Sequence, residues 1–512
     1  MTGFTLNMGY ILFFCRRKLY KSHAVKDTVR VDMVSLWYVL SLLTFLSLEA
    51  SGTNPGVQMR ITQKGLEYER EISIVPLQEK LKTIYIPDMS GKAEVLVMDV
   101  SYTVSDMRIQ EVDLLSSSVG LVPGTGVSLS INNAYIGLNG NWKVEYLFVD
   151  DDGWFSLYIG GLSVSATIGV NNDGQGRPSV YAAHCTASIG RVEITLHGGL
   201  SWLYQLFDSY INSAVLNALQ PQICNLVIEA INSLNPHLRT LNVLAQVDKY
   251  AEIDYSMVGS PFVSYSGIDL GLKGEFYNIG WHQEPPFSPT PFSLPAEDSK
   301  MMYIALSAFT MNSAGFVYNK AGVLYLYITD DMIPSGSPYR LDTKTFGVFI
   351  PEIAKQYPGL KMKLLVRAAK EPNISFEPNN MTMQASGTVT AYAIQPNATL
   401  SPLFILNMNA SVSALIYVSG LKVAGNVTLN KINMTLGTSY VGPIQVELLN
   451  NVLRTVLNFA VIPKVNALLK QGYPLPAIGQ MNLRNTQLQI LKDYVLIGTD
   501  VQFLGLELPD VL

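Results

Sequence analysis

The chain has 512 residues, of which 48% are apolar and only 15% are charged, and its net charge is −5. This length is sufficient for two or three domains, and the acidic balance excludes the basic footprint of a nucleic-acid-binding protein. A chain this apolar must bury a large hydrophobic surface. Composition does not distinguish a large dry core from an interior that takes up lipid.

Residues 1–52 predict an export signal behind an upstream extension. Residues 33–48 form an apolar stretch that follows six lysines and arginines and precedes the small residues Ala50, Ser51 and Gly52. This order is typical of a cleaved signal peptide. We expect translation to start at Met33 and the mature protein to be secreted and extracellular, with a signal anchor as the alternative.

Residues 53–250 are predicted to form a first domain. Val57, Ile61 and Tyr68 recur at near-helical spacing, which predicts an amphipathic helix. Apolar and polar residues then alternate from residue 92 to residue 193, which predicts antiparallel strands with hairpin turns at residues 122–126, 150–153 and 171–176.

A long apolar helix is predicted next, over residues 203–234, with an interruption at Pro221. Cys185 and Cys224 are the two cysteines that follow the signal segment, and in an oxidising compartment they are expected to pair. The bridge would tie a strand to this helix. By closing a loop of about forty residues it would stabilise the fold by roughly 3–4 kcal/mol.

The second half repeats the pattern of the first. Residues 251–299 hold strands and a proline-rich connector, and residues 300–475 again predict a helix (300–320), alternating strands (322–437) and a long helix (447–469) interrupted at Pro463. Residues 476–512 read as returning strands. Repetition of a whole supersecondary unit predicts two similar domains, each with its own core.

Six N-x-S/T sequons predict N-linked glycans on the second half. Glycans require solvent, so the surface that carries them is not expected to form a tight protein interface. The acceptor residues are Asn373, Asn380, Asn397, Asn409, Asn426 and Asn433.

Several segments carry a family resemblance: they read NPGVQMRITQKGLEYE, LKTIYIPDMSG, PPFSPTPFSLP, AGVLYLYITDDMIP, VELLNNVLRTVLNFAVIPKVN and KQGYPLP. Together they resemble the bactericidal/permeability-increasing (BPI) and lipopolysaccharide-binding protein (LBP) family, which also contains the cholesteryl ester and phospholipid transfer proteins (CETP and PLTP). Matching segments run from about residue 54 to residue 503. The segment RTLNVLAQVDKYAEIDYSMVGSP resembles most the branch called BPI fold-containing family C.

The resemblance implies an α+β fold, an elongated boomerang of two similar barrels joined by a central sheet and a proline-rich linker. Each barrel would combine a twisted antiparallel sheet with long helices and hold phospholipid acyl chains in an apolar pocket. The implied activity is non-covalent, with no cofactor, and Cys185 and Cys224 match the family's disulfide. The expected pocket residues are Ile61, Tyr68, Leu203, Phe207, Ile211, Leu449, Leu453 and Leu457.

The charge of the first domain departs from the family pattern. Members that bind lipopolysaccharide have a cationic first barrel that meets the phosphates of lipid A. Here residues 53–249 carry 12 lysines and arginines against 19 aspartates and glutamates, a net charge of −7. The family therefore implies lipid A binding in innate immune defence, whereas the charge argues against it. Candidate contacts to a lipid head group or membrane surface at the barrel tip are Lys92, Trp142, Lys143 and Arg191.

Two hypotheses stay open at this point. The first is a secreted, monomeric glycoprotein that binds phospholipid, with lipopolysaccharide or a membrane surface as a further partner and no nucleic acid. The alternative is a secreted interaction protein, or a neutral-lipid or phospholipid carrier, on the same fold without endotoxin binding.

The sequence offers no catalytic or metal site. It contains no nucleophile elbow or P-loop, and its histidines lack metal-ligand spacing. Asp150–Asp152 lack the alternating ligand spacing of a calcium loop.

Overall fold

The computed structural model describes residues 54–503, except residues 84, 96–97, 115, 147–148, 200–207, 242 and 478–480. The predicted signal segment lies outside the described residues. All described residues belong to one compact unit, Thr53–Leu512.

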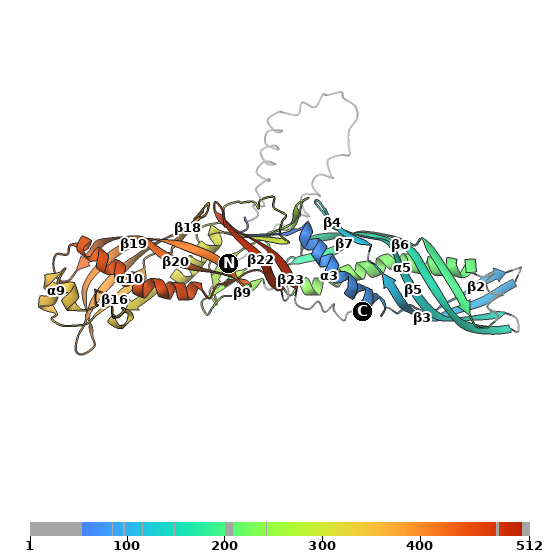
Figure 1. Ribbon diagram of the computed structural model, residues 1–512, viewed down its shortest axis with the longest axis horizontal. Coiled ribbons are helices and arrows are strands. Elements are labelled where there is room, and N and C mark those ends of the chain that lie inside the picture. The colour runs from blue at the N-terminus through green and yellow to red at the C-terminus, as the bar shows by residue number, and fades with distance from the viewer. Residues whose placement is uncertain are drawn as a thin grey trace, which may run out of the picture. The chain divides into compact units, whose positions relative to one another are not determined.

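The N-terminal half is built on a seven-stranded antiparallel sheet that is covered by helices. Helix α3 (Gln63–Leu81) precedes the sheet, and helix α5 (Asp208–Asn232) follows it and packs along β7 and β8 (Figure 1). The strands run in the order β2-β3-β5-β6-β7, with β4 on β5 and β8 on β6. Their bounds are β2 Met89–Val95, β3 Met98–Asp113, β4 Ser117–Val122, β5 Gly126–Tyr146, β6 Val149–Asn172, β7 Pro178–Ser188 and β8 Arg191–His197.

The C-terminal half repeats this plan with a second seven-stranded antiparallel sheet and the long helix α10 (Val446–Leu469), which packs along β20 (Figure 1). The strand order is β15-β16-β18-β19-β20-β21, with β17 on β18. The strands are β15 Tyr325–Ile328, β16 Met362–Ala368, β17 Asn373–Glu377, β18 Asn380–Ile394, β19 Leu400–Ser419, β20 Lys422–Ser439 and β21 Tyr473–Pro474. The shorter helices α6 Asn235–Leu238, α7 Ala308–Lys320, η2 Asp330–Met332, α8 Thr343–Gly347 and α9 Pro351–Gln356 complete the chain.

A six-stranded sheet joins segments from the beginning, middle and end of the chain. Its order is β11-β12-β1-β14-β23-β22, with β1 at Val57–Thr62, β11 at Phe262–Val263, β12 at Gly267–Leu272, β14 at Met302–Ser307, β22 at Met481–Ile490 and β23 at Tyr494–Phe503. A smaller three-stranded sheet has the order β13-β10-β9. Its strands are β9 Leu244–Gln246, β10 Ala251–Asp254 and β13 Glu275–Asn278. The predicted α+β class with antiparallel sheets is confirmed.

The duplicated plan gives each half its own apolar core. One cluster fills the N-terminal half and includes Phe155 and Leu157, a second fills the C-terminal half around Phe404 and Leu453, and a third lies around the central strands. Each seven-stranded sheet therefore buries one face against its own helices, as the internal repeat predicts.

Several predicted elements were wrong in detail. The segment predicted as one helix from Val57 begins as strand β1, because Val57, Met59 and Ile61 alternate with polar residues before the helical spacing starts. The same correction applies to residues 300–320, which open with β14. Asp150–Gly153 form no turn, since Asp150, Asp151 and Asp152 lie in β6 and pair with β5.

The two predicted helix interruptions were also wrong. Pro221 lies inside the continuous helix α5, and Pro463 lies inside α10. Both prolines are exposed, and on a solvent-facing side a helix can bend to relieve the clash of the ring. The region predicted as strands over 322–437 also contains η2, α8 and α9.

One buried ion pair fastens the central sheet to the proline-rich connector. Arg60 on β1 is 7% exposed, and its Nε and Nη2 donate to the two carboxylate oxygens of Asp269 on β12 at 2.6 and 2.8 Å. Its remaining Nη1 donates to the carbonyl oxygen of Pro295 at 2.7 Å. The hydrogen bond to Asp269 raises the pKa of Arg60 further, against the opposing effect of burial.

Removing this arginine should destabilise the whole fold. We expect Arg60→Ala to lower the free energy of unfolding by about 3 kcal/mol, because it removes a buried guanidinium and leaves the partly buried Asp269 carboxylate without its partner. Lys64→Ala breaks the more exposed pair with Asp500 and should cost less than about 1 kcal/mol. Denaturant unfolding of both variants checks this, and equal losses would contradict the assigned role of Arg60.

The predicted disulfide between Cys185 and Cys224 is present and joins β7 to α5. It closes a loop with a sequence separation of 39. Because this bond restricts the unfolded chain, the Cys185→Ala/Cys224→Ala variant should lose roughly 3–4 kcal/mol of unfolding free energy. Differential scanning calorimetry with and without reductant measures the loss, and an unchanged melting temperature would refute it.

Candidate lipid-binding site

The interior of the N-terminal half is a layer of apolar side chains between the sheet and two helices. From the sheet, Leu138, Phe155 and Ile159 are almost fully buried. From α5, the residues that pack against this layer follow helical spacing but are only partly buried: Leu216, Leu219, Ile223 and Val227. The sheet side of this interior is therefore closely packed, while the α5 side retains accessible apolar surface.

The interior of the C-terminal half is packed more tightly around α10. Leu449, Leu453 and Leu457 are 0%, 1% and 5% exposed, and they lie in one cluster with residues of β16, β18 and β19. Helix α10 is apolar and long enough to span a membrane by composition, yet its inward face contacts this core. These three leucines are thus buried against the sheet, and their contact with lipid stays a prediction.

The remaining predicted pocket residues are placed differently. Ile61 lies on β1 and packs partly buried against two clusters, and Tyr68 on α3 stacks on Phe503 at a centroid distance of 6.4 Å. Leu203 and Phe207 lie outside the described residues. Ile211 lies in α5, and its side chain is also outside the described part. Of the five residues predicted for the N-terminal pocket, only the side chains of Ile61 and Tyr68 lie in the described part of the chain, so the two expected pockets stay a prediction.

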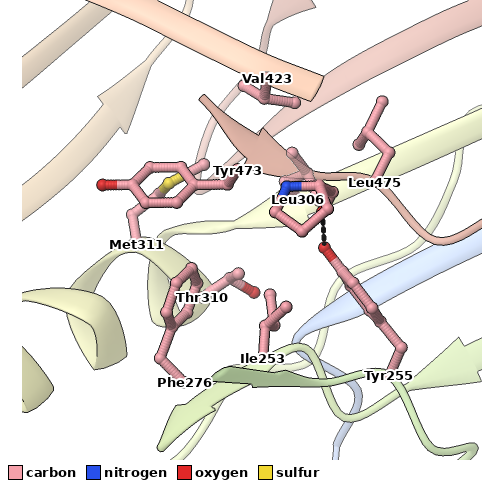
Figure 2. A pocket seen from close by; sticks show the side chains of 10 residues that line it. Ile253, Tyr255, Phe276, Leu306, Thr310, Met311, Val423, Tyr473 and Leu475 are labelled. Carbon is pink, nitrogen blue, oxygen red and sulfur yellow. Dashed lines mark hydrogen bonds between the residues drawn. The ribbon is translucent and has the colours of Figure 1, made fainter. Parts of the chain in front are cut away.

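A narrow cavity lies where the small sheet, α7 and β21 meet (Figure 2). Its walls come from segments far apart in the sequence and are mostly apolar: Ile253, Tyr255, Phe276, Leu306, Thr310, Met311, Val423, Tyr473, Pro474 and Leu475. The rings of Phe276 and Tyr473 meet edge to face at 5.3 Å. The cavity is apolar and has room for about one water molecule, so it does not hold an acyl chain as its side chains stand.

Two tyrosines supply the polar groups of this cavity. The Tyr255 hydroxyl donates to the carbonyl oxygen of Pro474 at 2.6 Å, as the dashed line in Figure 2 shows. Burial raises the pKa of Tyr255, and burial together with the charge of Asp248 raises the pKa of Tyr473 to about 12. Both hydroxyls stay protonated at physiological pH, so neither adds an anion to the cavity.

Sequence reasoning missed these cavity residues because they come from six separate elements and the segments next to them. The alternation of Ile253 with Tyr255 marks a buried strand face, but it does not identify the partners across the cavity. Tyr473 lies in the KQGYPLP segment, which is one of the segments that carry the family resemblance. That segment was the one feature of the sequence that could have pointed to this part of the cavity.

Three of the predicted tip residues are exposed cations, and two of them are paired with glutamates. Lys143 Nζ lies 2.6 Å from Glu145 Oε1, and Arg191 Nε lies 3.5 Å from Glu193 Oε1. Arg191 also lies over the ring of Tyr158 at 5.3 Å, while Lys92 is exposed on β2. Much of the positive charge available to a lipid phosphate is therefore offset locally.

Trp142 does not lie on the surface as a head-group contact requires. It is 3% exposed, belongs to the N-terminal core, and donates from Nε1 to the carbonyl oxygens of Trp154 and His197 at 3.1 and 3.2 Å. Its position on β5 faces inward because the alternating neighbours Asn141 and Lys143 face solvent. Trp154, half exposed and stacked on His197, is the exposed aromatic residue of this region.

The sequons lie on the sheet of the C-terminal half. Asn373, Asn380, Asn397, Asn409 and Asn433 are exposed, and Asn426 is partly buried. Asn409 on β19 is directly opposite Asn433 on β20. Their glycosylation stays a prediction.

Comparison with known proteins finds family matches over most of the described chain. Residues 65–241 match the N-terminal domain of the LBP / BPI / CETP family, and residues 245–503 match its C-terminal domain. A bactericidal permeability-increasing protein of Sebastes schlegelii is 57% identical over 92% of this chain and 99% of its own length. A lipopolysaccharide-binding protein of Bos taurus is 35% identical over 91% of this chain and 97% of its own length.

A solved structure supports the fold. The crystal structure of a lipopolysaccharide binding protein, 35% identical, covers 88% of this chain and all of its own with a TM-score of 0.61. The human BPI fold-containing family C protein is 28% identical over 91% of this chain and 93% of its own length. That identity is lower than the values for the two relatives above, so the finer placement in family C is not supported.

The packing of α10 yields a test of whether its leucines form core or pocket. We expect Leu453→Ala to lower the free energy of unfolding by about 2–5 kcal/mol, because it leaves a cavity in a closed core. Leu448→Ala, at an exposed position of the same helix, should change it by less than about 0.5 kcal/mol. Denaturant unfolding of lipid-free protein compares the two, and a small effect of Leu453→Ala would indicate an open pocket there instead.

Proposed function

Because the chain belongs to the LBP / BPI / CETP family, we propose that it is a secreted protein that binds lipid without altering it covalently. The N-terminal interior is the proposed site for phospholipid acyl chains. The relatives are named for bactericidal action and lipopolysaccharide binding. This comparison supports the lipid class and leaves the head group to experiment.

One observation carries the proposal for the N-terminal interior. The inward face of α5 keeps partly accessible apolar surface, while the inward face of α10 is closed. Each methylene of an acyl chain that enters such a surface gains roughly 0.8 kcal/mol, so a chain of a dozen carbons would be held tightly. Without a ligand, this apolar surface would lack packing partners, whereas protein interiors are normally close-packed.

Lipopolysaccharide binding is the second candidate function. The names of the relatives favour it, whereas the paired cations Lys143 and Arg191 and the net charge of −7 over residues 53–249 oppose it. We therefore propose a carrier of phospholipid whose N-terminal tip does not select endotoxin by charge. Secretion, N-glycosylation and a monomeric state are part of this proposal.

Filling the accessible space beside α5 should displace the bound lipid. We expect Val227→Trp to reduce the phospholipid that copurifies with the secreted protein by at least about tenfold, because the indole occupies the volume of several methylenes. Asn225→Trp, which places the same ring on the exposed side of α5, should leave the lipid content unchanged.

Native mass spectrometry of both variants measures the lipid content, and thermal unfolding verifies that each is folded. Equal lipid content in folded Val227→Trp and in the wild type would contradict an acyl-chain site beside α5. A wild type that carries no lipid when purified from secreting cells would overturn the proposed function itself.

A further inference from the structure

The two halves of the chain carry opposite net charge. Residues 53–249 have 12 lysines and arginines against 19 aspartates and glutamates, a net of −7, and residues 300–475 have 14 against 7, a net of +7. The cationic half is therefore the C-terminal one, the reverse of what the family resemblance implied. Within a Debye length of about 8 Å, an anionic surface would be repelled by the first half and attracted to the second.

A strip of cations and tyrosines runs along the edge of the C-terminal sheet. Lys363 and Arg367 on β16 face away from the core, because the alternate residues Met362 and Leu364 are fully buried. Edge strand β15 adds two exposed tyrosines, and β18 adds a partly buried one directly opposite Lys363. We name this strip the basic–tyrosine face; it consists of Tyr325, Tyr327, Lys363, Arg367 and Tyr392.

The two cations of this face have aromatic rings rather than carboxylates as neighbours. Lys363 Nζ lies 4.2 Å from the ring centre of Tyr327, and Arg367 Cζ lies 5.8 Å from that of Tyr325. Within the described part of the chain, neither has a carboxylate within ion-pair distance, which sets them apart from the neighbouring Lys361, whose Nζ lies 2.6 Å from Asp330. A ring face positions a cation without neutralising it, so both remain available to an external anion.

We propose that the basic–tyrosine face docks the protein on a lipid surface that carries anionic phosphate head groups. Lysine and arginine bind such phosphates through their charge, and tyrosine rings favour the boundary between head groups and acyl chains. The proposal rests on the proposed lipid-binding function and adds to it the surface that contacts the lipid head groups.

The nearest predicted glycan limits how the face can approach lipid. Asn409 pairs with Ser386 on β18, whereas Arg367 pairs with Thr388, two residues further along the same strand. A sugar on Asn409 would stand beside the face rather than on it. Contact is therefore made by the long side chains of Lys363 and Arg367, and Asn409→Gln should leave vesicle affinity equal or higher.

The test compares binding of the full secreted chain to vesicles of phosphatidylcholine with phosphatidylserine and to vesicles of phosphatidylcholine alone. Lys363→Gln/Arg367→Gln should weaken binding to the anionic vesicles about 30-fold, since each lost cation near the surface is worth about fivefold. The control Lys344→Gln/Lys470→Gln removes the same charge from exposed positions elsewhere in this half and should weaken binding by less than about threefold.

Each outcome decides the proposal. Equal binding by the face variant and the wild type overturns it, as does an equal loss in the control, which would indicate diffuse attraction by the whole half. A loss of affinity with Asn409→Gln would also count against it. Native mass spectrometry of the lipid that copurifies with the face variant distinguishes a failure of this proposal from a failure of the proposed function. The face variant should keep its internal lipid but bind anionic vesicles more weakly.

Discussion

The structure depends on the central position of strand β1 in the six-stranded sheet. This strand pairs with β12 on one side and with β14 on the other, so that Met59 faces Leu270 and Ile304. Strand β14 then pairs with β23 near the end of the described chain. Both halves therefore share one hydrogen-bonded sheet. Arg60 pairs with Asp269 within this sheet and also donates a hydrogen bond to the carbonyl oxygen of Pro295 in the connector. Each seven-stranded sheet and its helices are attached to this shared sheet by short connections.

The two similar halves differ in how their long helices are packed. Each half has a seven-stranded sheet and a long helix, but the described inward residues of α5 are only partly buried, whereas those of α10 are almost fully buried. The disulfide fixes α5 to β7, so this helix is held by a covalent bond where α10 is held by close packing. An internal repeat thus conserves the architecture and leaves the packing of each interior to its own side chains.

Sequence patterns predicted the long-period features well, and local boundaries less well. The repeat, the alternation in the two sheets and the long helices were predicted correctly, because each extends over many residues. The disulfide was predicted correctly because only two cysteines follow the signal segment. The errors at Val57, Pro221 and Asp150 each involve a few residues whose local preference was overridden by the sheet or by solvent exposure. The cavity lining at Tyr255 and Tyr473 could not be predicted, since contacts between distant segments depend on how the strands assemble. The inward burial of Trp142 was missed although its alternation with the polar neighbours Asn141 and Lys143 indicates it.

The place of β1 has a consequence for the order in which this protein is made. Met59 leaves the ribosome about 245 residues before its partner Ile304, a wait of roughly 12–50 s at ordinary rates of translation. During that time a strand whose two neighbours do not yet exist presents unpaired amide and carbonyl groups beside apolar side chains, which is the condition that favours aggregation. The beginning of the nascent chain is therefore exposed to aggregation until the part that completes the sheet has been synthesised.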